Sequence, residues 1–479
     1  MVMEYLPILT ILIVLIGALL SLVVPEKAKG PLSTVFTFAS LIVVLAMLPT
    51  ILAGKVIFSY FEGVDFSVDA LSLLVLIAST SLGFLATLFS LSYISHEREK
   101  IGNYYTFFML TIAGLIAIPL VKNIFLMYAL LEGTTWTFTV LVAFRRDARA
   151  LEASYKYLIL SSFGASVLII GSAIVLARIG SLSALDLYLK SPALAKDISV
   201  FKLCFFSFLI GFGVKAGIVP LHFWLPDAHS EAPSPVSAIL SGVAIQLGAY
   251  CMLRTIAIMN PFLSSWDHII VLGLGVITAL VGAFMAMVQT DIKRMLAYSS
   301  VDEIGYILVG LGLGTFAGLN GAVFDIFNHT LMKGMLFLCA GTLIFRTGKR
   351  GIAEMGGLSR RMPITAIAFM IGSLGMAGVP PLNGFYSKYI IYKAAFDAGY
   401  PIVTILLIIA SAIALGYYLK ATHAIFFGET LEAFKNVREA PISMTIPLIA
   451  LSMLCLFFGI VPQIPLTIVE FAVKALVGG

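Results

Sequence analysis

A lysine in an otherwise apolar stretch is the residue of this chain whose chemistry most needs an explanation. Lys215 lies within residues 205–219, a stretch that is otherwise typical of a membrane-spanning segment. Burying an ammonium group in hydrocarbon costs several kcal/mol on any scale. The segment is interrupted at Pro220, which frees backbone groups that need water or protein partners. A protonatable group beside a water-filled break predicts ion translocation.

Further charged residues lie deep in apolar segments. They are Glu132, Lys333 and Lys388. A charge in such a place usually faces the interior of a helix bundle and marks an ion path. A structural ion pair could explain any one of them, whereas four such residues in separate segments favour the ion path.

One segment carries a whole row of polar groups. Asp325, His329 and Lys333 are spaced at i, i+4 and i+8, which places them on one face of a helix. An acid, an imidazole and an amine in dry surroundings could relay protons. A hydrogen-bonded seam between two helices is the alternative.

Lys388 repeats the pattern of Lys215. It follows an interruption at residues 380–384, so two segments each pair a proline-rich break with one buried lysine. Broken helices in corresponding positions of two halves are typical of transporters built from inverted repeats. The two halves show no convincing similarity residue by residue, so the repeat is inferred from architecture.

The elements that position these residues are membrane helices. The chain has 479 residues, of which 60% are hydrophobic and 11% are charged, and its mean hydropathy is +1.05. These values predict an all-α membrane protein with about fourteen transmembrane helices. We expect them near residues 6–24, 31–53, 69–93, 104–121, 123–144, 155–177, 201–219 with a continuation to about 229, 234–258, 268–288, 296–314, 320–345, 363–379 with a continuation over 384–398, 401–427 and 442–462.

The predicted segments fall into four regions. Residues 1–103 hold three N-terminal helices, 104–258 and 268–427 form two inverted five-helix repeats with discontinuous seventh and twelfth helices, and 428–479 hold the last helix and a short tail. Most loop lysines and arginines, Arg98 and Lys100 among them, fall in alternate loops. These loops are expected in the cytoplasm, so both termini are expected on the outer side of the cell membrane.

Composition and motifs exclude several function classes. No Lys/Arg-rich arm is present, so we expect no nucleic-acid partner. Cys204, Cys251, Cys339 and Cys455 each stand alone in apolar runs, which predicts neither a metal site nor a disulfide framework. Haem ligands, iron–sulfur cysteines and nucleotide loops are also lacking. We therefore expect no cofactor, no metal and no catalytic residue in this chain.

Four segments together resemble one family. They are KAGIVPLHFWLPDAHSEAPSPVSA (215–238), DIKRMLAYSSVDEIGY (291–306), FNHTLMKGMLFLCAG (327–341) and GVPPLNGFYSK (378–388). Over about residues 70–430 the chain resembles the antiporter-like, proton-translocating subunits of respiratory complex I, Mrp-type cation antiporters and membrane-bound hydrogenases. The resemblance implies ion-translocating roles for Glu132, Lys215, His329, Lys333 and Lys388.

One position departs from the family pattern. Many members carry a lysine or histidine in the eighth span, where this chain has Gln246. Glutamine does not titrate, although it can hold a water chain. His222 and His229 flank the first break and could supply the missing relay. The simpler interpretation, which is slightly favoured, is that both histidines cap a loop.

Together these features predict an ion-translocating subunit, with the proton as the expected ion, in a redox-driven complex of the hydrogenase or complex I type. The expected partners are other membrane subunits, a peripheral redox module on the cytoplasmic side and the lipid bilayer. The alternatives are a subunit of an Mrp-type Na⁺/H⁺ antiporter, a stand-alone secondary transporter and a structural subunit that has lost transport. In each case in which the chain moves ions, the charge of Glu132 is expected to keep Lys215 protonated. Moving the Glu132 carboxylate away is expected to release that proton.

Overall fold

The computed structural model describes residues 2–61, 64–95 and 103–477, and these residues are mostly helical. Arg98 and Lys100, assigned above to a cytoplasmic loop, lie outside the described residues. The helices of at least eight residues are α1 (Val2–Val23), α2 (Glu26–Leu52), α3 (Ala70–Ser95), α4 (Tyr104–Ala117), α5 (Ile124–Val142), α6 (Ala148–Ile179), α7 (Ala184–Leu194), α8 (Ile198–Ala216), α9 (Trp224–Glu231), α11 (Ile245–Met259), α12 (Ser265–Met287), α13 (Ile292–Gly312), α14 (Phe316–Thr347), α15 (Pro363–Met376), α16 (Asn383–Asp397), α17 (Pro401–Thr422), α18 (Ile442–Ile460) and α19 (Gln463–Val477).

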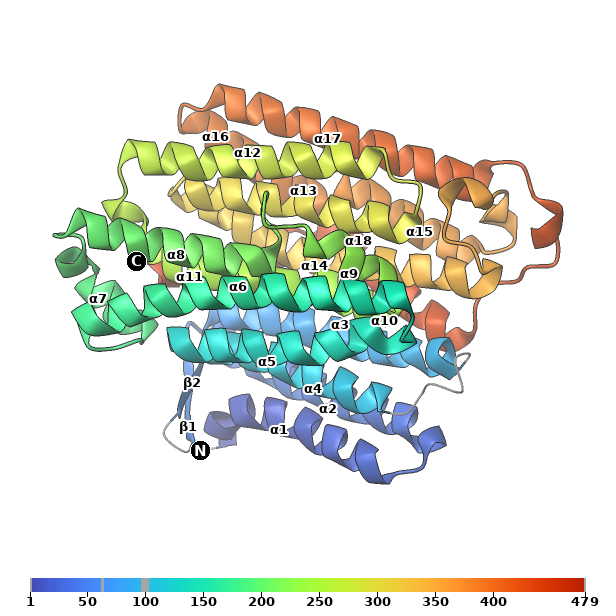
Figure 1. The fold of residues 1–479 in the computed structure, drawn as a ribbon, viewed down its shortest axis with the longest axis horizontal. Helices are drawn as coiled ribbons and strands as arrows, with labels where there is room; N and C mark the ends of the chain where they lie inside the picture. The colour runs from blue at the N-terminus through green and yellow to red at the C-terminus, as the bar shows by residue number, and fades with distance from the viewer. Residues whose placement is uncertain (1, 62–63, 96–102, 478–479) are drawn as a thin grey trace.

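The long helices form one bundle whose members run along the horizontal axis of Figure 1. In the described residues, eleven helices are long and apolar enough to cross a membrane. This confirms the predicted all-α membrane fold, while the number fourteen and the inverted repeat stay predictions. Both ends of the chain lie at the left of Figure 1, as an even number of spans requires.

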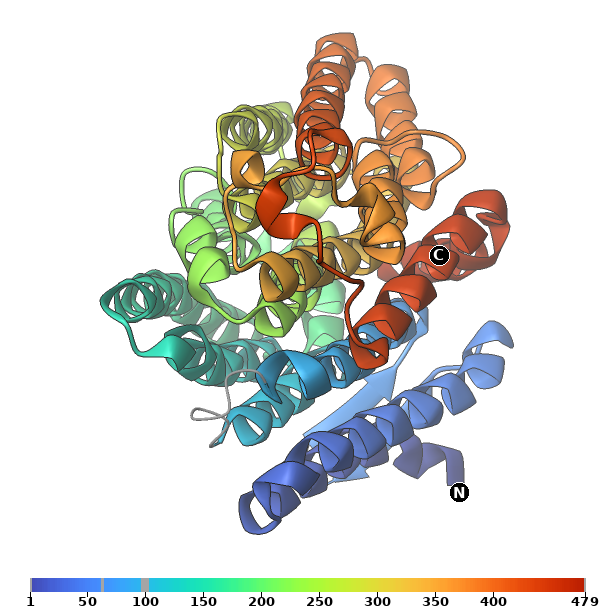
Figure 2. The ribbon, with the colours of Figure 1, turned by 90° about the vertical axis from the view of Figure 1, so that its right-hand side faces the viewer.

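Helix α14 lies in the middle of the bundle, where it packs against α3, α13, α16 and α18. All its residues from Gly318 to Leu343 are buried. The turned view in Figure 2 shows the other helices arranged around this central region. Because α14 carries the predicted polar row, its position puts that row in the interior.

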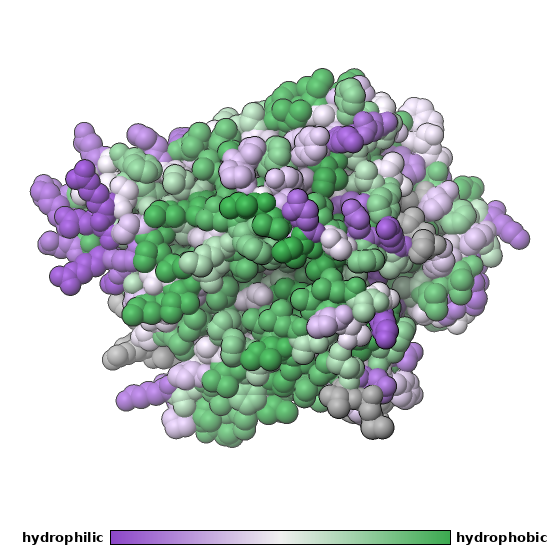
Figure 3. Space-filling view, turned by 180° about the vertical axis from the view of Figure 1, so that it is seen from behind, coloured by the Kyte–Doolittle hydropathy of each residue, from purple (hydrophilic) through white to green (hydrophobic). Residues whose placement is uncertain are grey.

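The surface matches a lipid environment. In Figure 3 a broad hydrophobic belt separates hydrophilic ends, and hydrophilic side chains gather most densely at the left, which is the right-hand end of Figure 1. Exposed apolar side chains include Trp136, Ile159 and Ile405. Lipid contact explains why large hydrophobic residues lie outside as well as inside.

A small β-hairpin was not expected from the sequence. Strands β1 (Ile57–Phe61) and β2 (Val64–Val68) pair antiparallel, with Ile57 opposite Val68. The hairpin connects α2 to α3 on the side of the molecule that carries the termini (Figure 1). It adds a short irregular region to an otherwise helical chain.

Both predicted helix breaks are present. Helix α8 ends at Ala216, Gly217 takes a left-handed conformation with φ of 80°, and the chain resumes as α9. The Trp224 indole N–H donates to the Val214 carbonyl over 2.9 Å, which satisfies one backbone group freed by the break. The second break separates α15 from α16, where Asn328 and Asn383 exchange hydrogen bonds of 3.0 and 3.1 Å.

The eighth predicted span is also irregular. It begins with the short helix α10 (Ser234–Ile239), passes through a π-helical turn at Leu240–Ala244 and continues as α11. π-Helical turns frequently occur at functional sites. The turn ends at Ala244, two residues before Gln246.

Candidate ion path

The first buried ion pair joins α5 and α8. The Lys215 ammonium donates to Glu132 over 2.8 Å and to the Thr135 hydroxyl over 2.6 Å. Thr135 lies one turn after Glu132 on α5, so both reach the same ammonium group. The Ser162 hydroxyl donates to the other carboxylate oxygen over 3.2 Å. The structure thus brings together the lysine and the acid that the sequence predicted to interact.

The two members of this pair differ in exposure. The Lys215 side chain is 4% exposed, whereas that of Glu132 is 17% exposed. Lys215 is held against α11, because a Cβ on Gly248 would meet the backbone of Lys215 and Ala216 at 2.7 to 3.0 Å. The lysine is therefore fixed in the interior, and its carboxylate partner lies nearer the lateral surface of the bundle.

In the middle of the bundle, Gln246 of α11 contacts His329 of α14. The Gln246 side-chain nitrogen is hydrogen-bonded to His329 Nδ1. His329 Nε2 and the Gln246 amide oxygen have no hydrogen-bond partner among the described residues. Both side chains are buried. Gln246 thus links the first half of the chain to the polar row on α14.

Lys333 is one turn further along α14 and is fully buried. Its ammonium donates to the Ser299 hydroxyl, to the Leu296 carbonyl over 3.2 Å and to the Tyr418 hydroxyl over 3.3 Å. None of these partners is a carboxylate. Because its hydrogen bonds go to neutral oxygens only, the Lys333 ammonium has no counter-ion at contact distance.

The second buried ion pair joins α13 and α16. Lys388 Nζ lies 2.7 Å from Glu303 Oε1, and the two side chains are 2% and 1% exposed. The ammonium also donates to the Met376 carbonyl over 2.7 Å and lies 4.2 Å from the centre of the Tyr306 ring. The sequence analysis identified Lys388 but missed Glu303.

Two further carboxylates lie near this pair. Asp325 accepts a hydrogen bond of 2.7 Å from Ser387. Asp302, which precedes Glu303, is buried, and neither of its carboxylate oxygens has a hydrogen-bond partner in the described residues. An isolated charged carboxylate in such a place is costly, so Asp302 is suited to carrying a proton.

The polar row on α14 is arranged differently from a simple relay. Asp325, His329 and Lys333 share one buried face, as predicted, but no hydrogen bond between them is recorded. Each contacts a different neighbouring helix instead: α16, α11 and α13, respectively. The row therefore connects several helices, and an ion moving along it must step between partners.

The two candidate histidines beside the first break occupy different surroundings. His229 is fully buried and stacks on Phe337 of α14, with ring centres 4.9 Å apart. His222 stacks on Phe223 at 4.8 Å. No hydrogen bond from either ring to Gln246 is recorded, so neither directly replaces the missing titratable group.

The arrangement can hold and transfer protons. Among the described residues, no cluster of three His, Cys, Asp or Glu side chains could hold a metal ion. The four cysteines are buried and unpaired. What the interior offers is a series of titratable groups from Glu132 and Lys215, through His329 and Lys333, to Lys388.

Several known proteins are similar to this chain in sequence. Hydrogenase-4 component B of Escherichia coli (strain K12) is 32% identical over 428 residues, which are 84% of this chain and 63% of that protein. NADH-quinone oxidoreductase subunit N of Desulforudis audaxviator (strain MP104C) is 30% identical over 98% of both chains. The chain thus spans less than two thirds of the first relative and nearly all of the second.

A solved structure shows the same fold. A chain in the Mrp complex from Dietzia sp. DQ12-45-1b superposes with a TM-score of 0.91, covering 100% of this chain and 98% of that one at 22% identity. The model of the family described as "NADH:quinone oxidoreductase/Mrp antiporter, TM" matches residues 121–414, a range that holds both buried ion pairs. This chain therefore belongs to the NADH:quinone oxidoreductase/Mrp antiporter transmembrane family.

Proposed function

We propose that this chain is the ion-translocating membrane subunit of a multisubunit, redox-driven complex and that it moves protons along its buried row of Glu, Lys and His residues. The observation that carries the proposal is the presence of two buried Glu–Lys pairs, Glu132–Lys215 and Glu303–Lys388, each with its lysine beside a helix break. Buried ionisable groups in membrane segments are rare and usually functional.

The pairs act as electrostatic switches. Two unit charges about 4 Å apart in an effective dielectric of about 20 attract each other by about 4 kcal/mol. Since about 1.4 kcal/mol changes a protonation equilibrium tenfold, moving Glu132 away from Lys215 changes the protonated fraction of the lysine by about three orders of magnitude. Separation of the pair drives the proton onward, and its re-formation draws the next one in.

The middle of the path passes through Gln246 and His329. A proton that leaves Lys215 travels by water-mediated hydrogen bonds to the imidazole, then to Lys333, whose ammonium has neutral partners only. Two further carboxylates lie beside the second pair: Asp325 is hydrogen-bonded to Ser387, next to Lys388, and buried Asp302 precedes Glu303. Lys388 and Glu303 lie at the far end of the row, where their charges set how readily Lys333 accepts a proton.

We infer the partners of this chain from its relatives and from the exposure of Glu132. Relatives named as components of a hydrogenase and of a quinone oxidoreductase support a complex with further membrane subunits and a peripheral redox module. We place that module at the arginine-rich end of the bundle, which the positive-inside rule assigns to the cytoplasm. The partial exposure of Glu132 suits contact with a neighbouring membrane subunit that modulates the first pair.

A second candidate function is a subunit of an Mrp-type Na⁺/H⁺ antiporter. The full-length fold match to a chain of an Mrp complex favours it. The same carboxylates could serve either H⁺ or Na⁺, so the ion must be measured.

The test is ion flux in the intact complex. The complex is purified from its native membrane, reconstituted in liposomes and driven by its electron donor, while internal pH and sodium are followed with dyes. We expect proton uptake in the native complex, and loss of that uptake in Lys215→Met with unchanged subunit composition. Proton uptake at the native rate by Lys215→Met would contradict the proposal. Ion flux in a complex that contains no redox subunit would favour the antiporter. Ion flux by this chain alone would favour a stand-alone transporter.

A further inference from the structure

A second cluster of buried charges lies away from the ion path, at the end of the bundle that carries the termini. Arg254 of α11 is paired with Asp69, the residue that separates β2 from α3. Lys122, in the connection before α5, lies 3.4 Å from the other oxygen of Asp69. The cluster therefore holds two positive charges and one negative charge.

Hydroxyl groups join these charges into one hydrogen-bonded chain. The Lys122 ammonium donates to the Ser72 hydroxyl over 2.6 Å, and Ser72 lies 3.3 Å from the Tyr250 hydroxyl. Arg254 donates to Tyr250 over 3.0 Å and to Ser72 over 3.1 Å. Every member touches at least two others, and the Ser72 and Tyr250 hydroxyls also donate to the Pro119 carbonyl over 2.6 and 3.2 Å. Because hydroxyl hydrogens rotate, turning them from Pro119 toward their neighbours gives a proton at Tyr250 a route to Lys122.

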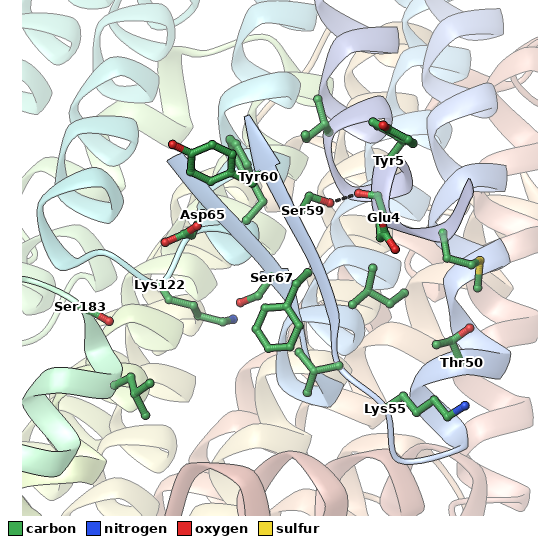
Figure 4. Close-up of a pocket in the computed structure, with 17 residues that line it drawn as sticks. Glu4, Tyr5, Thr50, Lys55, Ser59, Tyr60, Asp65, Ser67, Lys122 and Ser183 are labelled. Carbon is green, nitrogen blue, oxygen red and sulfur yellow. Dashed lines mark hydrogen bonds between the residues drawn. The ribbon is translucent and has the colours of Figure 1, made fainter. Parts of the chain in front are cut away.

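At its outer end the chain opens into a pocket. Lys122 lines a cavity of about 880 Å³ between the β-hairpin, α1 and the start of α7. Figure 4 shows Lys122 extending toward the hairpin, with Asp65 and Ser67 on one side and Ser183 on the other. Asp65 and Lys55, which also line the pocket, are exposed. The pocket gives Lys122 access to solvent.

At its inner end the chain points to the ion path. Gln246, Tyr250 and Arg254 are spaced four residues apart on α11 and so share one face of that helix. One turn of about 6 Å separates Gln246, which contacts His329, from Tyr250. Water-mediated hydrogen bonds cover such a distance.

We propose that Lys122, Asp69, Ser72, Tyr250 and Arg254, together with the pocket that Lys122 lines, form a port through which protons leave the ion path on the face that carries the termini. The inference rests on the proposed function. In this port, Tyr250 and Ser72 pass a proton to neutral Lys122. The resulting ammonium then releases the proton to water in the pocket.

The charges around Lys122 suit this role. Lys122 lies outside the membrane-spanning helices. The charged or titratable groups that face it are Asp69, Arg254 and Tyr250 in the cluster and Glu4, Tyr5, Lys55, Tyr60 and Asp65 in the pocket. Burial, followed by the neighbouring Arg254, lowers the pKa of Lys122 to about 7, and Asp69 only partly opposes this shift. Although burial acts to raise it, Arg254 and Lys122 hold the pKa of Asp69 well below its usual range. Lys122 therefore exchanges its proton near neutral pH, and Asp69 stays charged.

The first test removes single groups from the port. In the reconstituted intact complex, Lys122→Met and Tyr250→Phe are expected to slow proton translocation about tenfold, which corresponds to a barrier increase of about 1.4 kcal/mol. Lys196→Met, on the same face, is expected to keep the native rate. Native translocation is expected to slow as the pH on the side of the port falls below about 7, because Lys122 then stays protonated, and Lys122→Met is expected to lose this dependence. Native rates in both port variants would overturn the inference.

The second test needs no change inside the bundle. The native cysteines are buried, so a membrane-impermeant cationic thiol reagent labels an introduced surface cysteine selectively. Labelling Asp65→Cys from the side of the termini is expected to inhibit translocation by at least half, whereas labelling Lys196→Cys is expected to have no effect. If labelled Asp65→Cys translocates normally while Lys215→Met does not, the port is refuted and the proposed function stands. If the native complex translocates no ion, the proposed function itself fails.

Discussion

Replacing Glu303 by glutamine tests the ion path where the structure added most to the sequence. The carboxylate lies 2.7 Å from Lys388 Nζ, and both side chains are almost fully buried. At this distance, and with an effective dielectric of about 20, the two charges attract each other by about 6 kcal/mol. Salt screens such a buried pair little. Glu303→Gln keeps the shape of the side chain and removes this attraction.

The expected effect on transport is large. A loss of about 6 kcal/mol shifts the protonation equilibrium of Lys388 by on the order of ten-thousandfold, because about 1.4 kcal/mol corresponds to a factor of ten. We expect proton translocation by the reconstituted complex to fall at least tenfold, with electron transfer measured in parallel. Glu152→Gln, which breaks an exposed pair with Lys156 that is worth at most about 1 kcal/mol, is the matched control.

A double variant separates transport from stability. Glu303→Gln alone leaves a buried ammonium without its counter-ion, which typically costs about 3–5 kcal/mol. The thermal stability of the complex should therefore fall. Combining Glu303→Gln with Lys388→Met removes both charges, so stability should recover while transport stays lost. If Glu303→Gln translocated protons at the native rate, or if the double variant restored transport, the second pair would be structural only and the reasoning would be refuted.

Three further predictions concern single contacts. Ser162→Ala removes one hydrogen bond to Glu132, which is worth about 1 kcal/mol. The proton translocation rate in the same liposome assay should therefore change only a few-fold, and a complete loss of translocation would contradict this. Gln246→Leu removes the contact with His329 and should abolish translocation, while Gln246→Lys should retain it; equal rates in both would show that the contact is dispensable. Trp224→Phe loses the hydrogen bond to the first helix break and should lower the thermal stability of the complex without changing its subunit composition, and an unchanged melting temperature would contradict this.

The first ion pair could be predicted from the sequence because each of its two residues is a charge that stands out within its own apolar segment. A charge within a long apolar helix has to face the interior. Lys215 and Glu132, 83 residues apart, both met this condition, and the family resemblance indicated that they meet. The breaks were equally readable, since Pro220 and Pro380 interrupt apolar segments.

Glu303 was missed for a physical reason. Asp302 and Glu303 lie mid-way along a helix whose first turn also carries Lys293 and Arg294, so the segment is much more polar than its neighbours. Lys293 of the same helix is buried and donates to the carbonyls of Ser230 and Ala232. The sequence pattern gave no sign of this burial, because the accepting carbonyls lie at the end of α9, about 60 residues away along the chain.

The partners of the α14 row show a second limit. Spacing alone correctly placed Asp325, His329 and Lys333 on one buried face. It could not show that each residue contacts a different helix, because those contacts depend on how α11, α13 and α16 pack around α14. The β-hairpin escaped notice for a related reason: two five-residue strands between membrane helices carry little periodic signal.

Gln246 therefore has a more specific role than the loss of a titratable group suggests. A side-chain amide offers both a donor and an acceptor, whereas a lysine ammonium offers donors only. Through its nitrogen, Gln246 can donate to His329 Nδ1 when the proton of the imidazole is on Nε2. Through its oxygen, it can accept from Nδ1 when the proton is there. A glutamine thus supports both tautomers of His329, and an imidazole that passes a proton from one ring nitrogen to the other must occupy both in turn. In the proposed path, Gln246 therefore serves as the reorienting partner of His329.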